Sequence, residues 1–189
     1  MKKYTYLLIL VMSTLQLMAQ QNDKEYPEVG KPMPDFKFTN VKYADQKTLT
    51  KASFAGKWFV LDGWNRHCSI CLHKMPILNQ MKAVFKDSVR FLLVGYNGSL
   101  YSKAGDDKAI RELFEMNRKE QDLTLAIAYD SVMFHRFNIG ACPFMIIVDP
   151  KGIVRAVTTG FTSADLKNLM NNKPVVSRKA YRRDEIRTK

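Results

Sequence analysis

Short runs of apolar residues are the most regular feature of the chain. Runs of this length are typical of strands that are buried on both faces, as in a parallel or mixed sheet. They predict strands over residues 58–61, 89–94, 123–128 and 144–148. The tetrapeptide Asp149-Pro150-Lys151-Gly152 is a strong turn signal. It predicts that the last of these strands forms an antiparallel hairpin with residues 153–158.

Between these runs, apolar residues recur at helical spacing. The spacing predicts helices over residues 68–86, 109–119, 131–137 and 163–170, the last capped by Thr162 or Ser163. Strands that alternate with helices indicate an α/β fold. Near the start of the chain, the proline-containing stretch 30–50 includes the alternating tripeptide Phe36-Lys37-Phe38, which predicts an edge hairpin.

The first nineteen residues have a different pattern. Lys2 and Lys3 precede an apolar segment over residues 6–18, and Ala19 then meets a polar run. A positive start, a short apolar segment and a small residue at the junction predict a secretory signal that is cleaved near Ala19. The alternative is an uncleaved membrane anchor, although the segment is short for a span. We therefore expect a signal over 1–19, a linker over 20–28 and a soluble periplasmic protein.

Composition narrows the classes further. The chain has 189 residues, 46% of them hydrophobic and 25% charged, which suits one compact domain and excludes a disordered protein. Loss of Lys2 and Lys3 with the signal lowers the net charge from +12 to +10. Half of that excess lies in 171–189, so we expect 174–189 to be a solvated basic tail or an arm for an anionic surface. No basic patch interleaved with aromatic residues indicates nucleic acid.

The cysteines carry the candidate chemistry, because three are too few for a disulfide-stapled scaffold. Cys68-Ser69-Ile70-Cys71 lies where a buried strand leads into a helix. Unpaired N–H groups at a helix start stabilise a thiolate at Cys68, and Cys71 lies on the same face within disulfide reach. The spacing predicts a dithiol in which Cys68 attacks and Cys71 resolves. Two structural cysteines or half of a zinc site are the alternatives.

The segment 58–76 resembles the active-site region of thioredoxin-fold proteins. Trp64, four residues before Cys68, and Pro76, five after Cys71, occupy family positions. Residues 139–149 are similar to the family's cis-proline loop and the strand that follows. With the export signal and the N-terminal hairpin, residues 29–173 resemble the exported TlpA/ResA-like branch. The resemblance implies a thioredoxin fold, a central mixed sheet flanked by helices with an N-terminal β-hairpin extension, and no organic cofactor.

The resemblance also implies roles for individual residues. Asp62 matches the buried carboxylate that moves protons for the resolving cysteine. Pro143 implies a cis peptide beside the dithiol, where the backbone pairs with a bound substrate chain. We expect Trp64, His67 and Cys142 to line the substrate groove. His67 replaces a common tryptophan, so its imidazole either favours the Cys68 thiolate or is a surface substitution.

Cys142 directly precedes the implied cis-proline, a position that faces the dithiol in the family. Three interpretations follow: an inert residue in the groove, an extra redox partner, or a metal ligand beside Cys68 and Cys71. Soft thiolates favour copper(I) or zinc. The dipeptide Ser69-Ile70 lacks the proline found in many relatives, and because this dipeptide tunes the reduction potential, the direction of electron flow stays open.

These patterns predict an exported thiol–disulfide oxidoreductase that exchanges disulfides with protein substrates, in the reducing direction implied by the resemblance. Its electrons would come from a membrane thiol donor. The alternative is a copper- or zinc-binding or delivery module that uses Cys68, Cys71 and Cys142.

Overall fold

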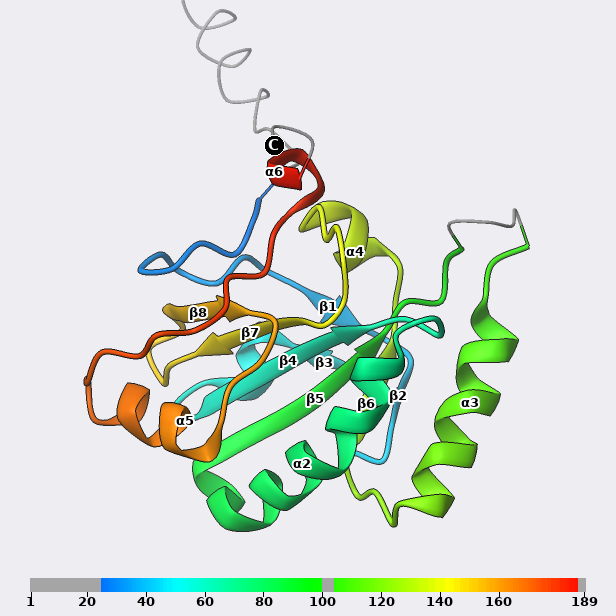
Figure 1. Cartoon of the computed structure of the whole chain (residues 1–189), viewed down its shortest axis with the longest axis horizontal. Coiled ribbons are helices and arrows are strands. Elements are labelled where there is room, and N and C mark those ends of the chain that lie inside the picture. The colour runs from blue at the N-terminus through cyan, green and yellow to red at the C-terminus, as the bar shows by residue number, and fades with distance from the viewer. Residues whose placement is uncertain (1–24, 100–103, 187–189) are drawn as a thin grey trace, which may run out of the picture.

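A six-stranded mixed sheet forms the centre of the computed structural model, which describes residues 25–99 and 104–186 (Figure 1). The strands lie in the order β2-β6-β5-β4-β7-β8. β4 is parallel to β5 and antiparallel to β7. The bounds are β2 Val41–Lys42, β4 Trp58–Trp64, β5 Val89–Gly95, β6 Ala126–Tyr129, β7 Phe144–Val148 and β8 Val154–Thr158.

The four buried strands predicted from apolar runs are present, and some of their bounds differ from the prediction. β4 extends to Trp64, and β6 begins at Ala126 where the strand was expected from residue 123. All seven residues of β4 are buried, including Asp62. Neighbouring strands cover both edges of β4 and side chains cover both of its faces, so the strand is enclosed on every side.

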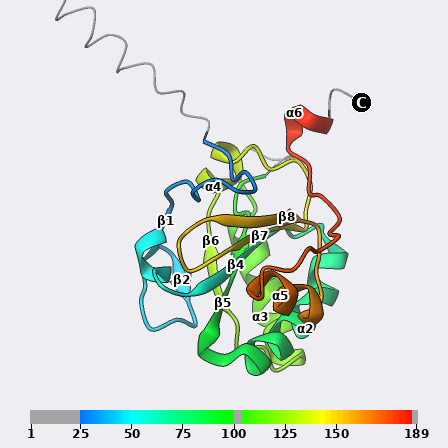
Figure 2. The same ribbon diagram turned by 90° about the vertical axis from the view of Figure 1, so that its left-hand side faces the viewer.

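The sheet separates two apolar layers. Figure 2 shows α2, α3 and α5 gathered on one side of the strands and the N-terminal region on the other. One layer packs beneath three helices, α2 Ser69–Phe85, α3 Asp107–Glu120 and α5 Ser163–Met170. The other packs beneath α4 Val132–Arg136 and the N-terminal region. Two short 3-10 helices, η1 Lys51–Phe54 and η2 Lys86–Ser88, lie at the ends of strands. Thr162 caps α5, since its hydroxyl accepts from the Asp165 N–H at 3.1 Å.

The N-terminal hairpin is present and divides between two sheets. β1 Lys37–Phe38 pairs antiparallel with β3 Leu49–Thr50 as a separate two-stranded sheet. β2 lies between them in sequence and pairs with β6 at the edge of the main sheet. Phe36 packs on Phe38 with 5.0 Å between ring centroids, so the hairpin carries its own aromatic contacts into the layer beneath it.

The C-terminal segment requires a correction. A solvated tail was expected over 174–189, but residues 178–186 pack on the domain. Lys179 forms an antiparallel bridge with Thr158 of β8, and Ala180 is only 2% exposed. A last helical turn, α6 Arg183–Ile186, follows. Basic composition indicated solvation, whereas backbone hydrogen bonds, which depend little on composition, hold this segment in place.

The predicted export signal, 1–19, and the first part of the linker lie outside the described residues. Within the part of the chain that the structure describes, no helix has the length and apolar character needed to cross a membrane.

Candidate active site

The two cysteines of the CxxC motif lie between the end of β4 and the first turn of α2. Cys68 and Cys71 form a disulfide, with 5.2 Å between their Cα atoms. Cys68 is the N-cap of α2, and its Sγ accepts a hydrogen bond from the Cys71 N–H at 3.2 Å. Cys68 is 9% exposed and Cys71 is fully buried. The accessible sulfur is therefore that of Cys68, and the helix N-terminus stabilises negative charge on it when the pair is reduced.

The loop before β7 lies against this dithiol. The Cys142–Pro143 peptide bond is cis, the geometry implied by the family resemblance. A pocket of about 210 Å³ joins this loop to the dithiol. Its lining consists of Asn65, His67, Cys68, Tyr96, Asp106, Ala141 and Cys142. The structure thus places Cys68, His67 and Cys142 around one opening, although the three are up to 75 positions apart in sequence.

Trp64 lies elsewhere, and its expected place in the substrate groove is corrected. Its side chain is fully buried and packs near Phe114 of α3, with 6.4 Å between ring centroids. The physical reason is the alternation of β4, which turns Trp64 towards the layer under α2 and α3. Trp64 belongs to the same buried apolar cluster as Cys68 and Cys71 and does not line the pocket.

Asp62 is the most unusual polar group in the core. It is 2% exposed, and neither carboxyl oxygen has a hydrogen-bond partner among the described residues. Strand alternation places it on the same side of β4 as Val60 and Trp64, the side that α2 covers. Desolvation raises the pKa of Asp62 to about 7. A carboxyl group with this pKa accepts and returns protons near neutral pH.

Lys74 counteracts the effect of burial on the pKa of Asp62, and the sequence analysis did not identify this residue. Its positive charge lowers the pKa of Asp62, against the larger effect of desolvation. The Lys74 ammonium donates to the Thr159 carbonyl at 2.7 Å, just after β8. A Cβ at Gly160 would collide with the ammonium in this position, so the flexible end of Lys74 would have to shift if residue 160 were not glycine. The spacing of three residues between Lys74 and Cys71 was the available signal, since such residues share a helix face.

Charged and polar groups also flank the exposed side of the pocket. Asp106, the N-cap of α3, pairs with Arg66, with Nε and Oδ1 3.0 Å apart. The His67 Nε2 lies 4.0 Å from the other Asp106 oxygen, and the His67 N–H donates to the Asn65 side chain at 2.9 Å. Asn65 and Asp106 are therefore site residues that the sequence analysis did not single out. They hold His67 at the rim of the pocket.

Cys142 is a free thiol with little tendency to ionise. Burial raises its pKa to about 12, and the nearby Asp62 carboxylate raises it too, while a hydrogen bond from Asn65 acts in the opposite direction. A protonated thiol is a poor nucleophile and a poor metal ligand. Across residues 25–99 and 104–186, no group of three His, Cys, Asp or Glu side chains is arranged to hold a metal ion. The copper or zinc alternative therefore has no support.

Comparisons with known proteins lead from this geometry to a class. The chain is 25% identical to the thiol-disulfide oxidoreductase ResA of Geobacillus kaustophilus, over 90% of this chain and 94% of that protein. It is 24% identical to ResA of Oceanobacillus iheyensis, over 88% of this chain and 84% of that protein. The chain is a TlpA/ResA-like thiol–disulfide oxidoreductase of the thioredoxin superfamily. A model of the Redoxin family matches residues 28–172, and the chain belongs to that family.

Solved structures show the same fold. The pneumococcal exposed lipoprotein thioredoxin Etrx1 from Streptococcus pneumoniae matches 74% of this chain and 99% of its own, with a TM-score of 0.58 and 20% identity. StoA from Bacillus subtilis matches 75% of this chain and 98% of its own, with a TM-score of 0.54 and 19% identity. These matches confirm the thioredoxin fold expected from the sequence.

The raised pKa of Cys142 gives a first prediction. In the oxidised protein, we expect iodoacetamide at pH 8 to alkylate Cys142 about a hundredfold more slowly than an ordinary exposed cysteine, because the thiolate is scarce. Mass spectrometry over time measures the rate. The same protein in guanidinium chloride is the control and should react at the ordinary rate. Equal rates in the folded and unfolded protein would contradict the burial of this thiol.

Asp62 gives a second prediction, for stability. Its pKa is higher in the folded than in the unfolded protein, so the folded state holds an extra proton between about pH 4 and pH 7. Stability from this group is therefore lost as pH rises through that window. Asp62→Asn removes the loss, and we expect it to stabilise the oxidised protein by on the order of 3 kcal/mol more at pH 8 than at pH 4.

Urea denaturation of both proteins at the two pH values measures this difference. Asp45→Asn, a change at an exposed loop carboxylate, is the matched control and should leave the pH dependence unaltered. An Asp62→Asn effect that is the same at pH 4 and pH 8 would show that the carboxyl group is not buried as described.

Proposed function

We propose that this protein is an exported reductant of protein disulfides. The observation that carries the proposal is the CxxC disulfide at the start of α2, in which Cys68 is the more exposed cysteine and lines the pocket while Cys71 is fully buried. The N-terminal sequence supports export, as does the likeness to an exposed lipoprotein thioredoxin. The curated relatives named thiol-disulfide oxidoreductase ResA support protein thiols and disulfides as substrates.

The reaction begins from the reduced dithiol. The Cys68 thiolate attacks one sulfur of the substrate disulfide, forms a mixed disulfide and releases the other substrate sulfur as a thiolate. The Cys71 thiol then gives its proton to Asp62 and attacks the Cys68 sulfur. The bond to the substrate breaks, the substrate leaves as a dithiol after protonation, and the Cys68–Cys71 disulfide remains. Two electrons pass from the protein to the substrate.

Asp62 is suited to the proton step for two reasons. It lies under α2 on the side of the buried Cys71, and its raised pKa lets it hold or release a proton near pH 7. Lys74 keeps that pKa from rising further. Ala141 and Cys142, directly before Pro143, form the other wall of the pocket, and an extended substrate chain would pair with the backbone there.

The disulfide must be reduced again for a second turnover. We propose a membrane thiol protein as the electron donor, which would attack Cys68, the more exposed sulfur. His67, half-exposed at the rim, lies where both substrate and donor would approach.

The assignment of the two cysteines predicts different outcomes for their replacement. Cys68→Ser should abolish reduction of insulin, because the nucleophile is lost. Cys71→Ser keeps the nucleophile and should trap a mixed disulfide with the substrate, because no thiol resolves it. Turbidity measures insulin reduction, and non-reducing electrophoresis detects the trapped species. Cys142→Ser is the matched control and should retain activity. Turnover that survives Cys68→Ser would overturn the assignment.

The direction of electron flow predicts the reduction potential. A reductant should equilibrate with glutathione or dithiothreitol buffers near thioredoxin, at roughly −270 mV. A potential closer to that of strong periplasmic oxidants, roughly −120 mV, would show that the protein oxidises its substrates. Fluorescence of Trp64, which is buried next to the dithiol helix, is a suitable probe of the titration.

A further inference from the structure

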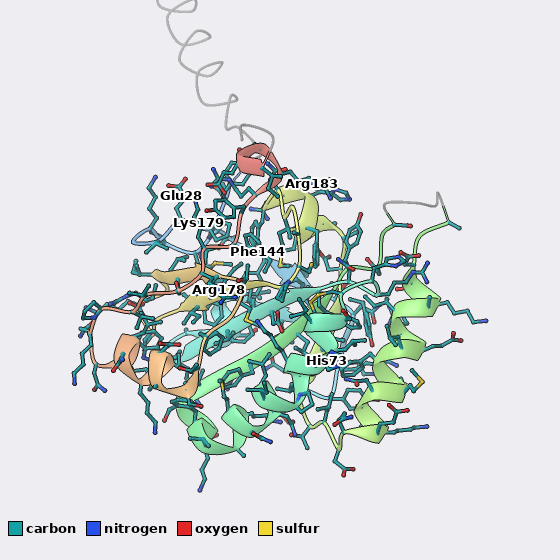
Figure 3. All side chains as sticks on the ribbon, viewed as in Figure 1. Glu28, His73, Phe144, Arg178, Lys179 and Arg183 are labelled. Atoms are coloured by element: carbon teal, nitrogen blue, oxygen red, sulfur yellow. A yellow bond between two sulfur atoms is a disulfide. The ribbon has the colours of Figure 1, made fainter. Side chains whose placement is uncertain are left out.

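The C-terminal segment, residues 178–186, connects two parts of the molecule that the active site depends on. After α5 the chain crosses an exposed stretch and then rises along the β8 edge of the sheet to α6 (Figures 1 and 2). Figure 3 labels Arg178, Lys179 and Arg183 along this path, together with Phe144 at the start of β7. We call residues 178–186 the C-terminal clasp.

The first half of the clasp extends the sheet. The Thr159 N–H donates to the Arg178 carbonyl at 2.9 Å, and the Ala180 N–H donates to the Val157 carbonyl at 3.2 Å. The Thr158 hydroxyl also donates to the Arg178 carbonyl, at 2.7 Å. Ala180 is buried against the layer under α4. Residues 178–180 therefore act as a short strand beside β8.

The second half of the clasp holds the turn that precedes the cis-proline loop. The Arg183 N–H donates to the Asn138 carbonyl at 2.9 Å. The Arg183 guanidinium donates from Nε to the Ile139 carbonyl at 3.0 Å. In return, the Asn138 amide donates to the Asp184 carboxylate at 2.8 Å. An antiparallel bridge between Ile139 and Arg182 completes the contact.

The fit at the next residue is close. A Cβ at Gly140 would lie 2.7 Å from Ile186 Cδ1 and 3.1 Å from the Arg183 backbone nitrogen. Glycine at this position therefore allows the clasp to lie directly on the turn. The chain from Asn138 to Gly140 is enclosed by residues that come more than forty positions later in the sequence.

The hydrogen bonds of the clasp end at Ile139, just before the residues of the loop that line the pocket. Backbone hydrogen bonds to other described residues stop at Ile139 and start again in β7, where Phe144 pairs with Gly63. In between, the backbone of Gly140, Ala141 and Cys142 makes none within the described chain. These three residues are thus fixed at both ends and leave their own backbone groups for an incoming chain.

We propose that the C-terminal clasp is a positioning element that sets the cis-proline loop for binding extended protein substrates. The proposal rests on the proposed function, because it assigns the loop to substrate binding. The clasp residues do not contact the sulfur atoms. They act on the reaction through the loop, so they should affect capture of a polypeptide and leave sulfur exchange with a small disulfide unchanged.

The test compares two substrates in three proteins, the wild type and two variants, each of which comprises residues 20–189. The variant Arg183→Ala/Asp184→Ala removes both side-chain hydrogen bonds to the turn without changing the net charge. We expect its KM for insulin to rise about three- to tenfold, the effect of one or two hydrogen bonds, with kcat retained. Its rate with hydroxyethyl disulfide should equal that of the wild type. Arg178→Ala, which removes a clasp arginine whose side chain does not contact the turn, is the matched control and should behave as wild type with both substrates.

An unchanged KM for insulin, or an equal loss with both substrates, would overturn the proposal. A wild type that reduces neither substrate would instead contradict the proposed function. Should the double variant fail to fold, Gly140→Ala gives a second test, because its Cβ displaces the clasp while Arg183 and Asp184 remain. It should raise the KM for insulin in the same way.

Amide hydrogen exchange of the wild type tests the clasp apart from activity. The Ala180 and Arg183 N–H groups should exchange slowly, because both donate to backbone carbonyls. In the double variant, exchange at Ile139 should become faster. Rapid exchange of Ala180 and Arg183 in the wild type would show that the clasp does not form.

Discussion

Enclosure of β4 is the constraint on which the rest of the structure depends. This strand has partners on both edges and apolar layers on both faces, so its register is fixed to the residue. Its last residue, Trp64, is locked in the core, and the chain has only four residues before α2 begins. The position of Cys68 at the helix start follows directly. The dithiol is placed by the sheet and needs no support from flexible loops.

The same enclosure creates the electrostatics of the site. A carboxyl group on a fully buried strand loses its hydration, and no described neighbour replaces it with a hydrogen bond. Asp62 therefore disfavours negative charge on the nearby thiol of Cys142. Its effect on Cys142 is visible in the raised pKa of that thiol. Lys74 supplies the opposing charge from α2, and Gly160 provides the space for it. Proton affinity in the site is thus set jointly by β4, α2 and the turn after β8.

The sequence predicted the central strands and the CxxC pair, and the predictions that were wrong have physical causes. Apolar runs located the central strands, and the CxxC spacing located the disulfide. The pattern ended β4 at Leu61 because Asp62 is acidic, although the strand buries that residue. Trp64 was expected in the groove from its family position, whereas strand alternation sends it inward.

The contacts of Lys74 and of the clasp depend on elements far away in the sequence. Lys74 reaches Thr159 across 85 positions, a pairing that no local pattern reports. Backbone groups, which every residue carries, make half of the hydrogen bonds between the clasp and the rest of the domain, and the side-chain bonds to the turn join residues more than forty positions apart, so the sequence of the clasp showed only its charge.

The short strand that the chain end adds beside β8 has a consequence for self-association. An exposed edge strand offers unpaired N–H and C=O groups to a second copy of the same sheet. Residues 178–180 occupy those groups on one side of the sheet, and the two-residue β2 shortens the opposite edge. The tendency of the protein to aggregate therefore depends on residues 178–180, because their loss would expose the β8 edge to strand pairing with another molecule.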